Sequence, residues 1–158
     1  LALHACNTAT DDAIALGIAA HVPAMAIVPC CQSELAKCWT EMTERPSNNP
    51  MFPIWNWPHL RRETAATMTD ALRCLLLQGC GYEATPLEFV PSSHTPKNTM
   101  IRANLRSEGS ANDFRDYLRL RESLGSPQLT LEKILPEPHR SRLHDAETKF
   151  LAGNTDSL

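Results

Sequence analysis

The opening of the chain constrains its fold most strongly, because apolar and helical patterns alternate there within a short span. An apolar run at Leu1–Cys6 precedes a helical pattern at Asp11–His21, which carries Ile14 and Ile18 on its apolar face, and a second apolar run covers Ala24–Val28. Strand, helix and strand at this spacing form a βαβ unit, whose two strands lie parallel and side by side. The sequence therefore predicts an α/β fold.

Polar residues stand where the first strand passes into the helix. Thr8 or Thr10 can cap the helix N-terminus, and the two aspartates that follow suit the positive end of the helix dipole. Helix capping does not explain His4, Cys6 and Asn7 at the strand end. Ligands of open α/β sheets bind at the carboxyl ends of strands, so these three residues are candidates for function.

The rest of the chain predicts further helices and a hairpin. The helical patterns are Gln32–Met42, Leu60–Gln78, Ala111–Leu124 and Arg140–Leu151, with a short apolar segment at Leu129–Leu135, and the two further strands are Tyr82–Val90 and Thr99–Leu105. The last two strands should pair as an antiparallel hairpin. Arg45–Pro58 holds four prolines and three large aromatic residues. We expect it to pack down as a lid or over a pocket; the alternative is a loop that patches the surface.

Composition limits the classes of function. The 158 residues suffice for one domain with a core, and a formal net charge of −3 gives no overall attraction to nucleic acid or anionic membranes. No apolar run is long enough for a membrane span, and no secretion signal is evident. The six cysteines lie mostly in apolar stretches, which favours a reducing, cytoplasmic compartment.

One segment departs from the weakly acidic average. Lys97–Arg121 holds six basic and three acidic residues, and it includes Phe114 and Tyr117. This combination is typical of an RNA-facing surface. The alternative is an ordinary solvated helix face whose apolar side packs on the core.

Three stretches together resemble one known family. They are L-H-A-C-N-T-A-T-D-D-A-I at Leu3–Ile14, V-P-C-C-Q-S-E-L at Val28–Leu35 and E-F-V-P-S-S-H-T-P-K-N-T-M-I-R-A at Glu88–Ala103. They resemble the second half of a class I S-adenosylmethionine-dependent methyltransferase, of a subgroup that includes relatives of tRNA 2′-O-methylating enzymes. The resemblance covers residues 1–106, and residues 107–158 would be a helical extension with a polar tail.

The resemblance implies a Rossmann-like sheet of order 3-2-1-4-5-7-6 with strand 7 antiparallel, of which this chain supplies strands 4, 5, 6 and 7. It also implies roles for the residues at the strand ends. His4 and Asn7 would be catalytic; His4, Ala5, Cys6 and Thr10 would bind the cofactor S-adenosylmethionine; and Pro29, Cys30, Cys31, His94, Lys97 and Asn98 would contact the substrate. His4 would serve as a base, or it is a buried histidine with satisfied hydrogen bonds.

The sequence departs from the family pattern at several points. Asn7 stands where relatives carry Asp or Gly, and Gln32 where many have His. The glycine-rich first loop and the acidic residue after strand 2 have no counterpart, because the six glycines come no closer than Gly79 and Gly81. We therefore expect the chain to be a fragment of a longer protein.

A zinc site is the rival chemistry at the same strand ends. His4, Cys6, Cys30 and Cys31 have the composition of a zinc site. However, adjacent strand residues point to opposite faces, so Cys30 and Cys31 are poorly placed to bind one ion, and we expect no metal.

The sequence thus predicts a methyltransferase that uses S-adenosylmethionine, with RNA as the leading acceptor and no membrane partner. The alternative is a non-catalytic binding or assembly module derived from such an enzyme. If the first strand forms a free sheet edge, a second copy of the chain can pair with it, which would give a homo-oligomer.

Overall fold

The computed structural model describes residues 1–5, 8–29, 33–90 and 98–155. The elements are β1 (Ala2–Ala5), α1 (Thr8–Ala19), β2 (Ala24–Pro29), α2 (Glu34–Met42), α3 (Phe52–Trp55), α4 (Pro58–Gly79), β3 (Tyr82–Glu88), β4 (Thr99–Leu105), the 3-10 turn η1 (Ala111–Phe114), α5 (Arg115–Ser123), α6 (Thr130–Ile134) and α7 (His139–Thr155). Within these ranges, no helix has both the length and the apolar character that a membrane span requires.

The four strands form one mixed sheet of order β1-β2-β4-β3. β1 and β2 are parallel, with Ala2 opposite Ile27, which confirms the βαβ unit. β4 lies between β2 and β3 and is antiparallel to both, and the predicted hairpin of β3 and β4 is confirmed. The chain therefore has an α/β fold, with one parallel and two antiparallel strand pairs.

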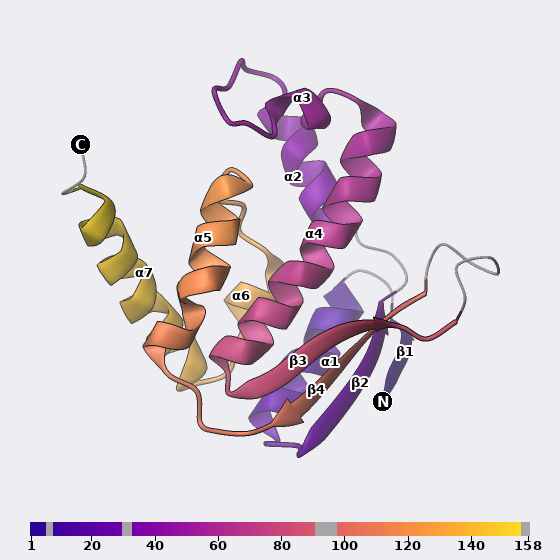
Figure 1. Cartoon of the computed structure of the whole chain (residues 1–158), viewed down its shortest axis with the longest axis vertical. Coiled ribbons are helices and arrows are strands. Elements are labelled where there is room, and N and C mark those ends of the chain that lie inside the picture. The colour runs from indigo at the N-terminus through magenta and orange to yellow at the C-terminus, as the bar shows by residue number, and fades with distance from the viewer. Residues whose placement is uncertain (6–7, 30–32, 91–97, 156–158) are drawn as a thin grey trace.

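Helices α1 and α4 pack on the same face of this sheet. Met25, Ala103 and Ala84 lie in register across β2, β4 and β3, and all three are buried. Gly17 of α1 approaches this face so closely that an added Cβ would lie 2.4 Å from the Met25 sulfur. On the opposite face, the paired residues Thr85 and Arg102 are exposed. Figure 1 shows the helices gathered to one side of the sheet.

Several helix boundaries differ from the prediction, most clearly those of α1 and of the predicted helix at Ala111–Leu124. α1 begins at Thr8 rather than Asp11, so Thr8 and Thr10, which were predicted as caps, lie in its first turn. The predicted single helix at Ala111–Leu124 begins as the 3-10 turn η1 and becomes α-helical at Arg115.

The helices after residue 107 share the core with the sheet and α4. Phe114 and Tyr117 are fully buried, and the continuous core extends as far as Ala146 in α7. The rings of Phe114 and Tyr117 are therefore not available to stack on RNA bases. Arg121 in α5 forms ion pairs with Glu132, at 2.7 Å, and with Glu147. The domain boundary after residue 106 stays a prediction.

The aromatic segment Arg45–Pro58 packs down at the end of the molecule away from the sheet, as Figure 1 shows for α3. Trp55 is 2% exposed and stacks on Trp39 of α2, with 5.6 Å between the ring centroids. Trp57, two residues later, is 59% exposed. The segment thus has one buried anchor and one ring open to solvent.

Candidate functional site at the carboxyl ends of β1 and β2

The carboxyl ends of the two parallel strands lie side by side. Ala5, the last residue of β1, is paired with Pro29, the last residue of β2. Helix α1 starts at Thr8 and α2 at Glu34, directly after the two strand ends. This is the edge at which open α/β sheets bind ligands, and it is the place where the sequence put its candidate residues.

The structure describes these candidate residues only in part. The backbones of His4 and Ala5 lie in β1, Pro29 is buried in β2, and Thr10 is 1% exposed in the first turn of α1. The side chains of His4 and Ala5, and the whole of Cys6, Asn7, Cys30, Cys31, His94 and Lys97, lie outside the described residues. The roles given to these residues stay predictions.

Asn98 is described, and its side-chain amide closes the β3–β4 hairpin. It donates to Glu88 Oε1 at 2.7 Å and to the Val90 carbonyl at 3.0 Å. The Asn98 carbonyl also accepts a hydrogen bond from the Phe89 amide at 3.1 Å. These contacts account for Asn98 structurally, and its predicted contact with substrate is not tested by them.

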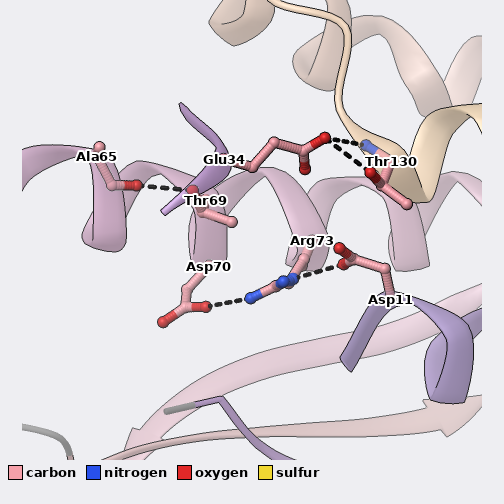
Figure 2. Close-up of polar contacts among 7 residues, drawn as sticks. All are labelled: Asp11, Glu34, Ala65, Thr69, Asp70, Arg73 and Thr130. Atoms are coloured by element: carbon pink, nitrogen blue, oxygen red, sulfur yellow. Dashed lines mark hydrogen bonds and ion pairs between the residues drawn. The ribbon is translucent and has the colours of Figure 1, made fainter. Parts of the chain in front are cut away.

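A buried ion network lies between α1 and α4 (Figure 2). The Arg73 Nε donates to Asp11 Oδ1 at 2.8 Å, and its Nη1 donates to Asp70 Oδ1 at 3.2 Å. The side chains of Arg73 and Asp11 are each 4% exposed. Because Asp11 sits in the first turn after the strand end, Arg73 fixes the beginning of α1 against the C-terminal half of α4.

A second polar contact joins the start of α2 to the C-terminal helices. Glu34 Oε1 accepts hydrogen bonds from the backbone N–H and the hydroxyl of Thr130, at 2.9 and 2.7 Å. Thr130 is the first residue of α6, so the carboxylate satisfies a free N–H at a helix N-terminus. Figure 2 shows Glu34 reaching this helix start from α2. Both helices that follow the strand ends are therefore held by buried or half-buried side chains.

The carboxylate of Asp11 is held in a buried ion pair with Arg73. Burial raises its pKa above the usual value, and the hydrogen bond and positive charge of Arg73 offset only part of that increase. Its Oδ1 is engaged by Arg73 within a dry environment. The network thus joins the first turn of α1 to α4.

Asp11→Asn tests this electrostatic assignment. In the wild type, the raised pKa means that the folded state binds more protons at Asp11 than the unfolded chain does between 3.8 and the folded value. The free energy of unfolding of the wild type should therefore fall relative to Asp11→Asn as the pH rises through that window. Urea unfolding of both proteins from about pH 4 to about pH 7 measures the difference. If the wild type instead gained stability relative to Asp11→Asn as the pH rises, the raised pKa of Asp11 would be contradicted.

Burial disfavours the reactive thiolate form of the described cysteines. Burial raises the pKa of Cys74 and of Cys80 to about 12, and it also raises the pKa of Cys38. These thiols stay protonated near neutral pH, whereas the thiolate is the reactive form. No cluster of His, Cys, Asp and Glu side chains that could hold a metal ion occurs among residues whose placement is described.

Sequence reasoning missed Arg73, which is central to this network. A signal was present, because Arg73 lies four residues after Thr69 and eight after Ala65, on the helix stripe that is buried. A charged residue on such a stripe needs a buried partner. Its partner Asp11 is 62 residues away in the sequence, and helical periodicity cannot identify it.

A comparison with protein families gives one match. Residues 1–38 match a family model described as a methyltransferase domain. The match spans β1, α1, β2 and the first half of α2, and so includes both strand ends of the site. No curated protein and no solved structure matched this chain. The family match supports the presence of a methyltransferase domain.

Proposed function

We propose that this chain supplies the second half of an S-adenosylmethionine-dependent methyltransferase domain. The strand order carries this proposal. If β1, β2, β3 and β4 correspond to strands 4, 5, 6 and 7, the order β1-β2-β4-β3 reads 4-5-7-6, and the antiparallel strand β4 takes the place of strand 7. The family match to residues 1–38 supports a methyltransferase domain.

The residues of this chain form only part of a cofactor site. The closest pair of glycines, Gly79 and Gly81, does not form a cradle, because a Cβ at Gly81 would lie 2.1 Å from the Ser107 carbonyl oxygen. That turn is filled by the chain itself. We propose that a glycine-rich loop from a polypeptide segment outside this sequence completes the site.

The cofactor would supply an electrophilic methyl group, and the chain's residues would hold the acceptor in line with it. In this proposal, His4, Ala5, Cys6 and Thr10 lie on the cofactor side, with His4 and Asn7 nearest the reacting atoms. The acceptor side is formed by Pro29, Cys30, Cys31, His94, Lys97 and Asn98. The Asp11–Arg73 ion pair would fix the start of α1 next to this edge of the sheet.

The free outer edge of β1 supports the proposal that another segment completes the sheet. β1 is an outer strand, and no strand among the described residues pairs with its outer edge. In the proposed domain, strand 1 of the upstream half pairs there. A second copy of the chain is the alternative occupant of that edge.

We propose that the methyl acceptor is RNA in the cytoplasm. A methyl-transfer assay tests whether RNA is the acceptor. The protein purified from its natural source is incubated with methyl-tritiated S-adenosylmethionine and either total RNA or total protein. We expect label in RNA that ribonuclease removes. Label in protein alone would mean that the acceptor is protein rather than RNA. No label in either substrate would favour the non-catalytic module.

A further inference from the structure

An exposed aromatic and cationic corner lies where α3 meets α4. Trp57 immediately precedes α4 and is 59% exposed, and Leu60 is 41% exposed. The other two tryptophans, Trp39 and Trp55, are 0% and 2% exposed. An indole that stays in solvent is unusual, because tryptophan is highly buried on average.

The backbone around Trp57 is held firmly. Its amide donates to the Ile54 carbonyl at 3.3 Å, and its carbonyl accepts from the Arg61 amide at 2.8 Å. The Arg61 Nη1 donates to the Trp55 carbonyl at 2.6 Å, next to the buried Trp55 ring. The exposed ring is therefore attached to a fixed corner, so little backbone freedom is lost when a ligand binds it.

The segment from Arg45 to Arg62 carries a positive net charge, although the chain as a whole is acidic. From Arg45 to Arg62 there are three arginines and one histidine but no aspartate or glutamate, and acidic residues resume at Glu63. Arg45, His59 and Arg62 are exposed, and none of them forms an ion pair with a described residue. Figure 1 shows the ends of α2 and α4 meeting beside α3, away from the sheet.

We propose that this corner binds single-stranded nucleic acid, with a base stacked on Trp57 and backbone phosphates beside His59 and Arg62. A flat aromatic ring next to cations is the combination that single-strand binding surfaces use, since every base has a face that can stack. A protein partner is less well matched, because Trp57 and Leu60 are the only large hydrophobic side chains exposed between Arg45 and Arg62. The inference rests on the proposed RNA acceptor and places its binding surface.

Fluorescence anisotropy of a dye-labelled oligouridylate, about twelve nucleotides long, tests the proposal with the full chain. Trp57→Ala should weaken binding roughly fivefold to a hundredfold, whereas Trp57→Phe should lose much less because a stacking ring remains. Arg62→Gln removes one phosphate contact. The slope of log affinity against log salt concentration should therefore become less steep by about 1. Arg140→Gln, which changes an exposed arginine paired with Glu137 at the start of α7, is the control and should leave binding unchanged.

Several outcomes would overturn the proposal. Equal RNA affinity of wild type and Trp57→Ala would do so, as would tighter binding of an oligoglutamate peptide than of RNA. Absence of any RNA binding would also reject it. A separate titration with S-adenosylmethionine distinguishes that result from failure of the methyltransferase assignment, because the corner lies outside the cofactor residues. Thermal unfolding of each variant verifies that the fold is retained.

Discussion

Arg73→Met is expected to lower the free energy of unfolding by about 3–5 kcal/mol. The substitution leaves Asp11 and Asp70 without their cation, in a site where the Asp11 side chain is 4% exposed. The energy of a buried ion pair is small in net terms, but removal of one partner leaves the desolvation cost of the other uncompensated. Since a domain is stable by only about 5–15 kcal/mol, the variant should unfold at low urea concentration.

Two further variants separate this effect from a general loss of side-chain packing. Arg62→Met changes an exposed arginine on the same helix and should alter stability by no more than about 0.5 kcal/mol. The double variant Asp11→Leu with Arg73→Met removes the more deeply buried pair and leaves the Asp70 carboxylate, whose side chain is 12% exposed, so it should recover part of the loss. A loss below about 1 kcal/mol for Arg73→Met alone would show that the ion pair is not what holds α1 against α4.

Trp39→Ala is expected to cost about 3–5 kcal/mol of stability. Trp39 is fully buried, stacks on Trp55, and donates its Nε1 proton to the Leu124 carbonyl at 2.9 Å. It therefore joins α2 to the aromatic segment and to the end of α5. Alanine removes the ring against which α3 is packed and leaves a large cavity.

Trp39→Phe is the matched variant, because it keeps an aromatic ring and removes only the hydrogen bond and part of the volume. We expect a loss of about 1–3 kcal/mol from the unpaired Leu124 carbonyl. Urea unfolding followed by circular dichroism measures both variants. Equal losses for Ala and Phe would mean that the hydrogen bond, rather than the packing, determines the stability of this region.

Local patterns in the sequence were sufficient to predict most of the helices and strands. The βαβ unit and the hairpin followed from the spacing of apolar runs, and both are present as β1–α1–β2 and β3–β4. The long helix α4 followed from the spacing of its apolar residues. These elements depend on neighbours close in the sequence, and so periodicity identifies them.

Long-range partners could not be predicted in the same way. Asp11 reads locally as a first-turn aspartate, and only the packed structure shows Arg73 as its buried partner. Phe114 and Tyr117 lie in a basic segment, yet their rings face the core because η1 and α5 pack on α4 and α7. Conversely, the aromatic segment gave no indication of which ring would be the anchor. Trp55 is buried against Trp39 of α2, a partner that local patterns do not identify, whereas Trp57 stays exposed.

Cofactor binding tests the central claim most directly. S-adenosylmethionine is titrated calorimetrically into the protein purified from its natural source, whose intact mass is measured on the same sample. We predict one saturable binding step and a mass above 17.6 kDa, the mass of this chain. No heat of binding at millimolar cofactor would contradict the claim that the carboxyl ends of β1 and β2 form part of a methyltransferase site.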